Sequence, residues 1–412
     1  MEQKISELKT EERDTLPQEE RRYTPLALVA LTHAFTHMQA SLMPLIYPFA
    51  VQEFGISYAV IGLLEGVSRF SGGLLQGPAG LLGRFIPRRI LLGLNNLLLA
   101  LSLGFLSLSA NFSHFFAATV MGRIVQSPQH PIGNSLISEW FGKKLRGFVF
   151  AINYSGANVG STIVPIIAGG LFAWVGWRGT AGIFVIPGVI SGLLAIFMLR
   201  HAGKVVVNTT EGSKPHLGGE ILKVFKDRNS RFVILTDILA TGARGLAVLS
   251  VYVPLYLRDT MREGLGLGAM ATSILYTVLL SGSVVGPLFL GRISDKFGRI
   301  RILRGILLAS SLSIFSIVLA GNNLFLVVPV LLVTGFATYS FSPLIQATLA
   351  DVADPSIRDL TFSVYFPASF AMGAIWTFVL GIVADQFGFQ TVFIVSSIAP
   401  LAALPFTLPI KE

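Results

Sequence analysis

The chain consists largely of apolar runs that are about as long as a membrane is thick. A helix that crosses a membrane needs roughly 20 mostly apolar residues, and runs of this length recur from residue 25 to residue 409 with short polar stretches between them. We therefore expect twelve transmembrane helices, near residues 25–50, 58–82, 90–110, 115–138, 148–174, 180–199, 231–257, 270–290, 302–320, 323–350, 360–385 and 389–409.

The composition agrees with an integral membrane protein. Hydrophobic residues make up 52% of the 412 residues and charged residues 13%, whereas a typical soluble chain has about 25% charged residues. The chain has no cysteine, so the fold uses neither a disulfide nor a thiolate metal site. No nucleotide-binding glycine loop, metal cluster or catalytic constellation is recognisable, so we expect no enzyme activity, no cofactor and no bound metal.

The net charge of +9 is distributed as in a membrane protein and not as in a nucleic-acid-binding one. Most Lys and Arg residues fall in the two tails and in alternate loops, and only Arg178, Arg258 and Arg262 fall in the other loops. Positive charge is concentrated in cytoplasmic loops. We therefore expect a multi-pass protein of the cell (inner or plasma) membrane with both termini in the cytoplasm.

A polar segment at 200–229 separates two sets of six expected helices. We predict a cytoplasmic tail at 1–24, an N-terminal six-helix bundle at 25–199, a cytoplasmic linker at 200–229 and a C-terminal six-helix bundle at 230–412. An amphipathic piece near 220–225 is expected to lie on the membrane surface.

A short basic loop occurs once in each half. It reads Gly-Arg-Ile-Ser-Asp-Lys-Phe-Gly-Arg-Ile-Arg over 291–301, and its counterpart at 80–89 keeps the position and the charge but lacks the acid. The pattern resembles the loop between the second and third helices of each half of a major facilitator superfamily transporter. This resemblance covers nearly the whole chain and implies an all-α membrane fold of two pseudo-symmetric six-helix bundles with the substrate site between them. It also assigns Asp295 and Arg299, and Arg88 and Arg89 of the first copy, to a cytoplasmic gate in which the acid pairs across the bundle ends.

Charged side chains inside the expected helices require a partner or a function, because a charge at the bilayer centre is costly. Glu65 and Arg69 lie four residues apart and can pair on one helix, whereas Arg123 lies at a similar depth and can compete for Glu65. Two arginines and one acid leave a net positive charge. We interpret the three as a network that faces the central cavity in binding or coupling.

Three histidines fall within the expected first-half helices. His33 and His37 are four residues apart and therefore share a helix face, and His130 lies between two prolines that should break its helix. For His37 two interpretations remain open: a proton or anion contact, or a neutral side chain hydrogen-bonded between helices. For His33 we favour the second interpretation, and for His130 a place in the cavity.

The stretch that begins at Arg123 resembles two branches of the superfamily. Arg123 and Gln126 match a motif of the fourth helix in proton-coupled drug exporters, although Ser127 stands where those proteins have glycine. The longer run that continues to Gly147 and Gly160 resembles the organic-anion and organophosphate branches more closely. The match to the fifth-helix motif of the drug exporters is weak and rests on Gly156, Gly160 and the prolines and glycines that follow them.

In the second half, Asp237 and Arg244 lie two helical turns apart. A midplane arginine between small residues suits a carboxylate, sulfonate or phosphate, because guanidinium offers paired donors. A structural Asp237–Arg244 pair is the alternative, and seven residues is a long reach for it. Further cavity-lining candidates are Tyr276, Gln346 and Tyr365.

The sequence thus predicts a monomeric secondary transporter of a small organic anion, driven by protons or by exchange for a counter-substrate. A proton-coupled multidrug efflux transporter is the alternative, and a transporter-like receptor or lipid flippase is a third hypothesis.

Overall fold

The computed structural model describes residues 20–141, 143–199, 217–354 and 357–411, and this part of the chain contains helices and no strand. The first half comprises α2 (Glu20–Phe54), α3 (Tyr58–Leu81), the 3₁₀ turn η1 (Leu82–Arg84), α4 (Arg88–Ser107), α5 (Phe112–Val125), α6 (Gln129–Trp140), α7 (Lys143–Ile183) and α8 (Val185–Met198). The second half comprises α9 (Leu217–Lys226), α10 (Arg228–Ala240), the turns η2 (Thr241–Ala243) and η3 (Gly245–Leu249), α11 (Ser250–Arg258), α12 (Ala269–Phe297), α13 (Arg299–Ala320), α14 (Leu324–Val352) and α15 (Arg358–Thr407).

Within the described residues, seven helical segments are long and apolar enough to cross a membrane. Two of them, at 152–198 and 360–407, are 47 and 48 residues long, which is more than one crossing requires. Each is divided by a glycine with positive φ, Gly176 at 67° and Gly388 at 79°, a conformation that other residues adopt at a cost. Each segment therefore contains two of the predicted spans.

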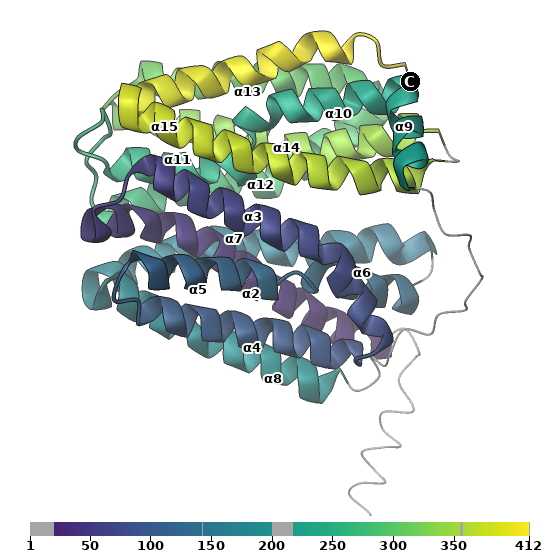
Figure 1. Ribbon diagram of the computed structural model, residues 1–412, viewed down its shortest axis with the longest axis horizontal. Coiled ribbons are helices and arrows are strands. Elements are labelled where there is room, and N and C mark those ends of the chain that lie inside the picture. Colours follow the sequence, from purple (N-terminus) through teal and green to yellow (C-terminus); the bar gives the residue numbers. More distant parts are fainter. Residues whose placement is uncertain (1–19, 142, 200–216, 355–356, 412) are drawn as a thin grey trace, which may run out of the picture.

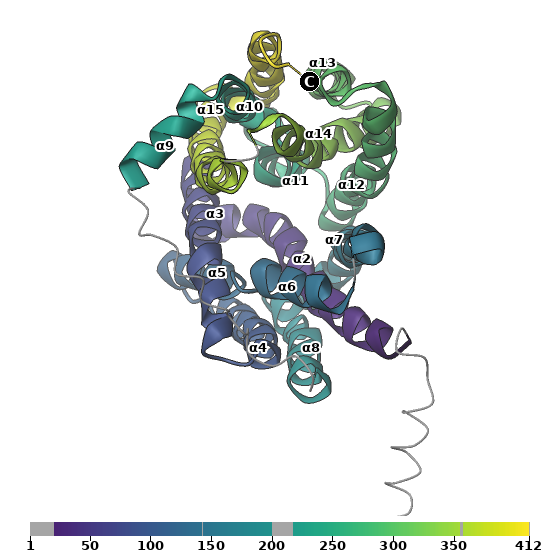
Figure 2. The ribbon, with the colours of Figure 1, turned by 90° about the vertical axis from the view of Figure 1, so that its right-hand side faces the viewer.

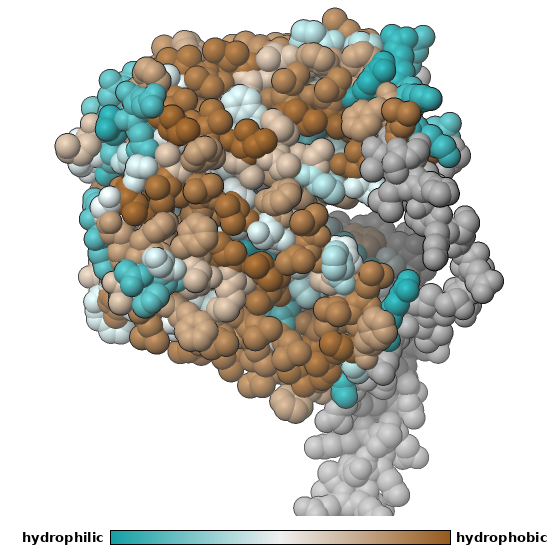
Figure 3. Space-filling model, in the orientation of Figure 1, coloured by the Kyte–Doolittle hydropathy of each residue, from teal (hydrophilic) through white to brown (hydrophobic). Residues whose placement is uncertain are grey.

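The predicted spans at 25–50, 58–82 and 115–138 lie in α2, α3 and the pair α5–α6, which are not among those seven segments. These are the helices that carry the buried His33, Glu65 and Arg123. In α2 and α3 the polar groups lower the hydropathy of the span, whereas α5 and α6, with 14 and 12 residues, are each too short to cross a membrane alone. Elsewhere the molecular surface is mostly hydrophobic, as the brown belt in Figure 3 shows.

The helices α2–α8 and α10–α15 form two bundles (Figure 1). Figure 2 shows that α3 lies beside α15 on one flank and α7 beside α12 on the other, and these pairs pack against each other. Glycines allow the close approach: a Cβ at Gly66 would lie 2.9 Å from the Ala374 carbonyl oxygen, and one at Gly169 would lie 2.7 Å from the Ser273 Cβ. Small residues at helix contacts are typical of membrane bundles, and these glycines let the two halves approach closely.

Two helices of the bundles are interrupted inside their span. The chain between α5 and α6 is not α-helical at 126–128. In the other half, α10 ends at Ala240, a 3₁₀ turn follows, Arg244 is extended with φ −70° and ψ 126°, and η3 is a π-helical turn. Such irregular backbone inside a membrane protein is tolerated where it is buried in protein or lines a cavity.

The two ends of the molecule differ in how the halves meet. At the end that contains Ser57–Ala59, which we call the closed end, the backbone N–H groups of Tyr58 and Ala59 donate to the two Asp385 oxygens at 2.9 Å. The Tyr58 hydroxyl also donates to Asp259. At the opposite end, which carries α9 and Lys411 and which we call the terminal end, Figure 3 shows the surface hollowed between the halves.

The closed end also has a strong contact within the first half. Arg178 pairs with Glu53 at 2.6 Å, and the Trp177 indole donates to the same carboxylate at 2.9 Å. The hydrogen bond from Arg178 lowers the pKa of Glu53 below its usual range. Trp177 and Arg178 therefore hold the end of α2 against the turn at Gly176.

The predicted boundaries of the tail and the linker fall partly outside the described residues. Residues 1–19 and 200–216 are not described, and α2 already begins at Glu20. The amphipathic piece expected near 220–225 lies within α9, where Leu222 and Phe225 are exposed and Val224 is buried.

Candidate functional site

A buried ionic group in the first half, the Glu65 cluster, consists of Tyr47, Glu65, Arg69 and Arg123. Glu65 is fully buried on α3, and its Oε1 pairs with both the Arg69 Nε and, at 3.1 Å, the Arg123 Nη2. The Tyr47 hydroxyl of α2 donates to the other carboxylate oxygen. The sequence left open which arginine Glu65 pairs with, and in the structure it pairs with both.

Close contact between α3 and α5 explains how Arg123 reaches Glu65. A Cβ at Gly72 would lie only 2.6 Å from the Arg123 carbonyl oxygen, and the Ser127 hydroxyl donates to the Gly72 carbonyl at 2.9 Å. The departure from the exporter motif at Ser127 therefore provides a hydrogen bond between these two helices. With two guanidinium groups and one carboxylate, the cluster keeps a net charge of about +1, because arginine stays protonated in proteins.

Arg69 connects this cluster to the second half. It interacts electrostatically with Tyr276 on α12 and with Tyr339 on α14, both of which are buried. The Tyr339 hydroxyl has no hydrogen-bond partner among the described residues. Its ring packs against Gly245, where a Cβ would clash with it, so the interrupted helix leaves room for this tyrosine.

A second ionic group, the Asp237 cluster, lies in the other half. Arg244 pairs with Asp237 and donates to the Ser369 hydroxyl at 2.7 Å, and the Tyr365 hydroxyl donates to Asp237 at 3.2 Å. The expectation that seven residues is too long a reach for this pair is wrong. It assumed a continuous helix, whereas the chain unwinds after Ala240 and returns the Arg244 side chain to Asp237.

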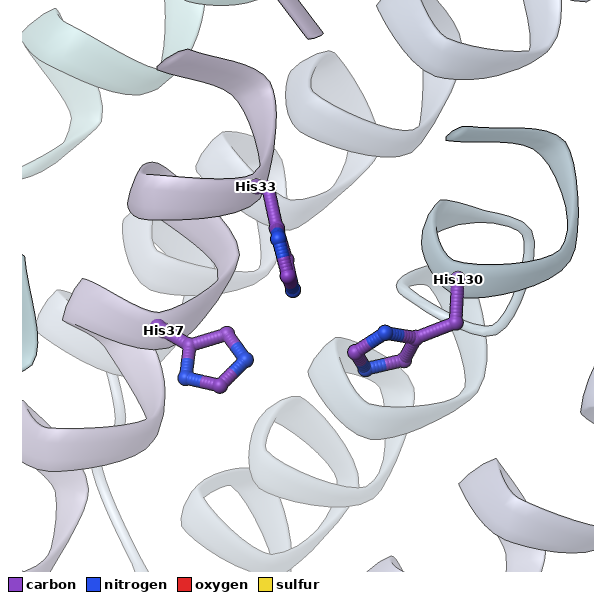
Figure 4. A group of neighbouring side chains, drawn as sticks. All are labelled: His33, His37 and His130. Carbon is purple, nitrogen blue, oxygen red and sulfur yellow. The ribbon is translucent and has the colours of Figure 1, made fainter. Parts of the chain in front are cut away.

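The three histidines form a third group, the His triad of His33, His37 and His130 (Figure 4). Their ring centroids lie 4.7, 4.9 and 6.0 Å apart, and the rings stand nearly perpendicular to one another. His33 is buried and the other two are half-buried. Neither ring nitrogen of His33 meets the distance and angle of a hydrogen bond among the described residues, but Asn153 of α7 interacts with this side chain, so the favoured interpretation of His33 as a hydrogen-bonded residue stays a prediction.

The remaining predicted site residues do not join these groups. Gln126 ends α5 and Gln346 lies on α14, and both are half-buried. No described hydrogen bond joins either side chain to the ionic clusters or to the His triad. Two residues that do belong to the clusters, Tyr47 and Ser369, were not predicted from the sequence. A single hydroxyl group on an apolar helix does not distinguish a site residue from any other.

The predicted gate residues lie at the terminal end. Arg88 is buried and pairs with Glu139 at 2.6 Å, while Arg89 is half-buried. Arg299 pairs with Asp295 at 3.0 Å and also with Asp351, at the rim of a pocket of about 330 Å³. Each of these pairs lies within one half, so pairing of Asp295 across the bundle ends stays a prediction.

The two helical bundles, their interrupted helices and the buried ionic cluster within each of them define a multi-pass membrane transporter. The chain belongs to the Major Facilitator Superfamily, whose family model matches residues 29–279 and 257–412.

Known proteins agree with this assignment. The chain is 24% identical over 383 residues, 92% of its length and 91% of the relative's, to the fosmidomycin resistance protein of Escherichia coli (strain K12). It is 32% identical over 146 residues to the probable L-galactonate transporter of the same organism, a match that covers 35% of this chain and 31% of the relative. Among solved structures, a nucleoside transporter is similar with a TM-score of 0.77 and 14% identity, over 93% of this chain and 99% of the other.

Proposed function

We propose that this protein is a secondary active transporter that moves a small organic anion by alternating access and performs no catalysis. The observation that supports this most is the unequal charge of the Glu65 cluster, in which Arg69 and Arg123 share one carboxylate. A buried excess of positive charge is unfavourable on its own, and an anionic substrate would neutralise it.

Arg69 is the member of this cluster best placed to contact a substrate. Its side chain is 17% exposed, against 0% for Glu65, and it interacts electrostatically with Tyr276 and Tyr339 of the second half. A bound anion could accept hydrogen bonds from Arg69 and from the unpartnered Tyr339 hydroxyl. It would thereby connect the two halves, as a substrate of an alternating-access transporter must.

Arg244 contributes less to this proposal than the sequence indicated. Asp237 already neutralises it, so the Asp237 cluster carries no excess charge. We propose that Arg244 positions Ser369 and Tyr365 and contacts the anion only if Asp237 takes up a proton. Proton coupling would then act through Asp237, whereas exchange requires only that one anion replaces another at Arg69.

We infer the side toward which the substrate site opens from the difference between the two ends of the molecule. With the closed end joined through Asp385 and Asp259, the site would open toward the terminal end, which we propose is the cytoplasmic face of a cell membrane. Asp295 and Arg299 would close that end in the opposite state. We further propose that the chain works as a monomer, because the site lies between its own two halves.

A proton-coupled multidrug exporter is the second candidate. The match of Arg123 and Gln126 to the exporter motif favours it, and the similarity over 92% of the chain to a relative named for fosmidomycin resistance favours drug export without favouring a cationic substrate. In that function Asp237 or Glu65 would carry the proton, and the substrates would be lipophilic and often cationic. The similarity to a relative named for L-galactonate, an organic anion, favours the first proposal.

A thermal-shift screen of the purified protein in detergent tests the proposal. The panel contains carboxylates, sulfonates, organophosphates and lipophilic cations at matched ionic strength. A ligand at 100 times its Kd stabilises the folded state by about 2.7 kcal/mol, so binding is visible as a higher unfolding midpoint.

We expect one anion class to raise the midpoint in the wild type, not in Arg69→Gln, and partly in Arg69→Lys, which keeps the charge but loses the paired donors. Stabilisation by lipophilic cations alone would refute the anion proposal and favour the exporter. An anion effect that is equal in Arg69→Gln and in the wild type would show that Arg69 is not part of the site.

A further inference from the structure

We propose that His33, His37 and His130 form a binding site for a divalent transition-metal ion such as Zn²⁺, Co²⁺ or Ni²⁺. The three side chains can each offer one ring nitrogen, and these atoms all lie within 4.8 Å of one another. This site goes beyond the proposed transport of an anion and does not depend on it.

The orientation of the rings permits convergence on one point. The three rings stand at 83° to 87° to one another, a geometry that is also usual in aromatic packing, and His33 and His130 both pack against Tyr154. Figure 4 shows the edges of His37 and His130 pointing toward each other, with His33 reaching between them from the same helix as His37. Nitrogen atoms on these ring edges can coordinate the same ion.

The fold fixes the register of the two helices that carry the triad. Gln129 donates to the Thr32 hydroxyl at 3.1 Å, and these residues immediately precede His130 and His33. A Cβ at Gly133 would lie 3.3 Å from the Val29 side chain, so glycine lets α6 approach α2 closely. The new helix start at Gln129 tolerates the proline that follows His130, because the first turn of a helix does not need that backbone N–H.

Burial makes the triad costly without a ligand. His33 is 1% exposed, and apart from its interaction with Asn153 neither of its ring nitrogens has a hydrogen-bond partner among the described residues. A buried polar group that is left unsatisfied costs about 1–3 kcal/mol. Protonation of the three rings would not remove this energetic cost, because three imidazolium ions would repel one another in a buried site. Neutral imidazole with a free lone pair is the form that binds metal.

The ligand set selects a class of ion. Imidazole suits Zn²⁺, Cu²⁺, Ni²⁺ and related ions, whereas Mg²⁺ and Ca²⁺ prefer oxygen. Three histidines are also a known ligand set for zinc sites with an open fourth position. Nitrogen atoms bound to zinc at about 2.05 Å lie roughly 3.3 Å apart in tetrahedral geometry, so side-chain rotation would have to bring these nitrogens closer by up to about 1.5 Å.

The surroundings permit access but do not favour positive charge. His37 and His130 are half-buried, so an ion can reach them. Arg123 interacts electrostatically with His37, and the Glu65 cluster to which Arg123 belongs keeps a net charge of about +1, so the imidazole ligands must outweigh this repulsion. The open fourth position would be filled by water or by another oxygen ligand.

Titration of the untagged full-length protein in detergent with Co²⁺ tests this site directly, because Co²⁺ held by nitrogen ligands in tetrahedral geometry absorbs visible light strongly. We expect one Co²⁺ per chain, displaced by Zn²⁺. His130→Gln and His37→Gln should each weaken the binding by about 100-fold or more, since even a residue that only supports a metal ligand is worth 10–100-fold.

His114→Gln is the matched control, because His114 is exposed at the start of α5, at the closed end. It should leave the Co²⁺ spectrum and affinity unchanged. Unfolding midpoints measured without metal show whether each variant is folded. Because two triad variants are compared, the test remains valid if one of them does not fold. Absence of visible absorption up to millimolar Co²⁺, or unchanged affinity in both folded triad variants, would overturn the proposal. Neither result would affect the anion proposal, since no transport substrate is present.

Discussion

Replacement of Glu65 by glutamine should destabilise the protein more than removal of either of its arginine partners. The carboxylate accepts from Arg69, from Arg123 and from the Tyr47 hydroxyl. Glutamine keeps the size and shape but removes the charge, and two buried guanidinium groups then lack a counter-charge.

The expected magnitude follows from these three contacts. Hydrogen bonds to charged groups contribute about 1.5–3 kcal/mol each, but they are not additive, and removal of one partner of a buried ion pair costs about 3–5 kcal/mol. We therefore expect Glu65→Gln to lower the free energy of unfolding by about 3–5 kcal/mol. Arg69→Gln leaves the neutral Glu65–Arg123 pair intact and should cost only about 1–2 kcal/mol.

Thermal unfolding in detergent, followed by tryptophan fluorescence, measures this difference. The double variant Glu65→Gln with Arg69→Gln is the decisive control, because it removes one of the two unpaired cations. It should be more stable than Glu65→Gln alone, with a coupling energy of about 0.5–3 kcal/mol. Equal midpoints for Glu65→Gln and the wild type, or additive losses in the double variant, would refute the argument that Glu65 holds both arginines.

Gly381→Ala should open the closed end, since its Cβ would lie 2.5 Å from backbone atoms of the first half. Gly373→Ala on the same helix is the control, with no atom closer than 3.7 Å. Spin-label distances across the closed end, read from cysteines introduced into this cysteine-free chain, should increase only in the first variant. Asp295→Asn should change the free energy of unfolding by less than about 1 kcal/mol, because the pair is exposed, yet alter which end is accessible to labelling; unchanged accessibility would contradict a gate. Because Arg178 lowers the pKa of Glu53, stability from this pair is present above the ordinary glutamate pKa of about 4.3 and lost as pH falls through the lower folded value. The unfolding midpoint should therefore fall more steeply with acid in the wild type than in Glu53→Gln, and parallel curves would contradict this.

Most of the fold could be predicted from residues that are adjacent in the chain. Each apolar run is long enough to be recognised without knowledge of its neighbours, and the basic loop at 291–301 identifies the family by residues that are adjacent in the chain. The turns at Gly176 and Gly388 fall where two predicted spans meet, because a change of direction between apolar runs requires a residue that tolerates positive φ.

The site depends on contacts that the sequence does not encode locally. The pair of Glu65 with Arg69 is local and could be predicted, whereas the pair with Arg123 is decided by the approach of α5 to α3 at Gly72, which lies far from Arg123 in the chain. His130 comes to His33 through the register of α6 on α2. The Arg244–Asp237 pair depends on an unwound segment, and periodicity alone predicts a continuous helix there.

If the substrate is an anion that binds at the Glu65 cluster, as proposed, the excess charge of this cluster should also make transport sensitive to membrane voltage. An empty site carries about one positive charge, whereas a site that holds a monovalent anion is neutral. Moving one charge through the full potential changes the free energy by about 2.3 kcal/mol per 100 mV, and reorientation of a central site moves part of that distance. Voltage should therefore act on the return of the empty carrier and leave the loaded step unaffected, so that exchange of one anion for another proceeds without net current.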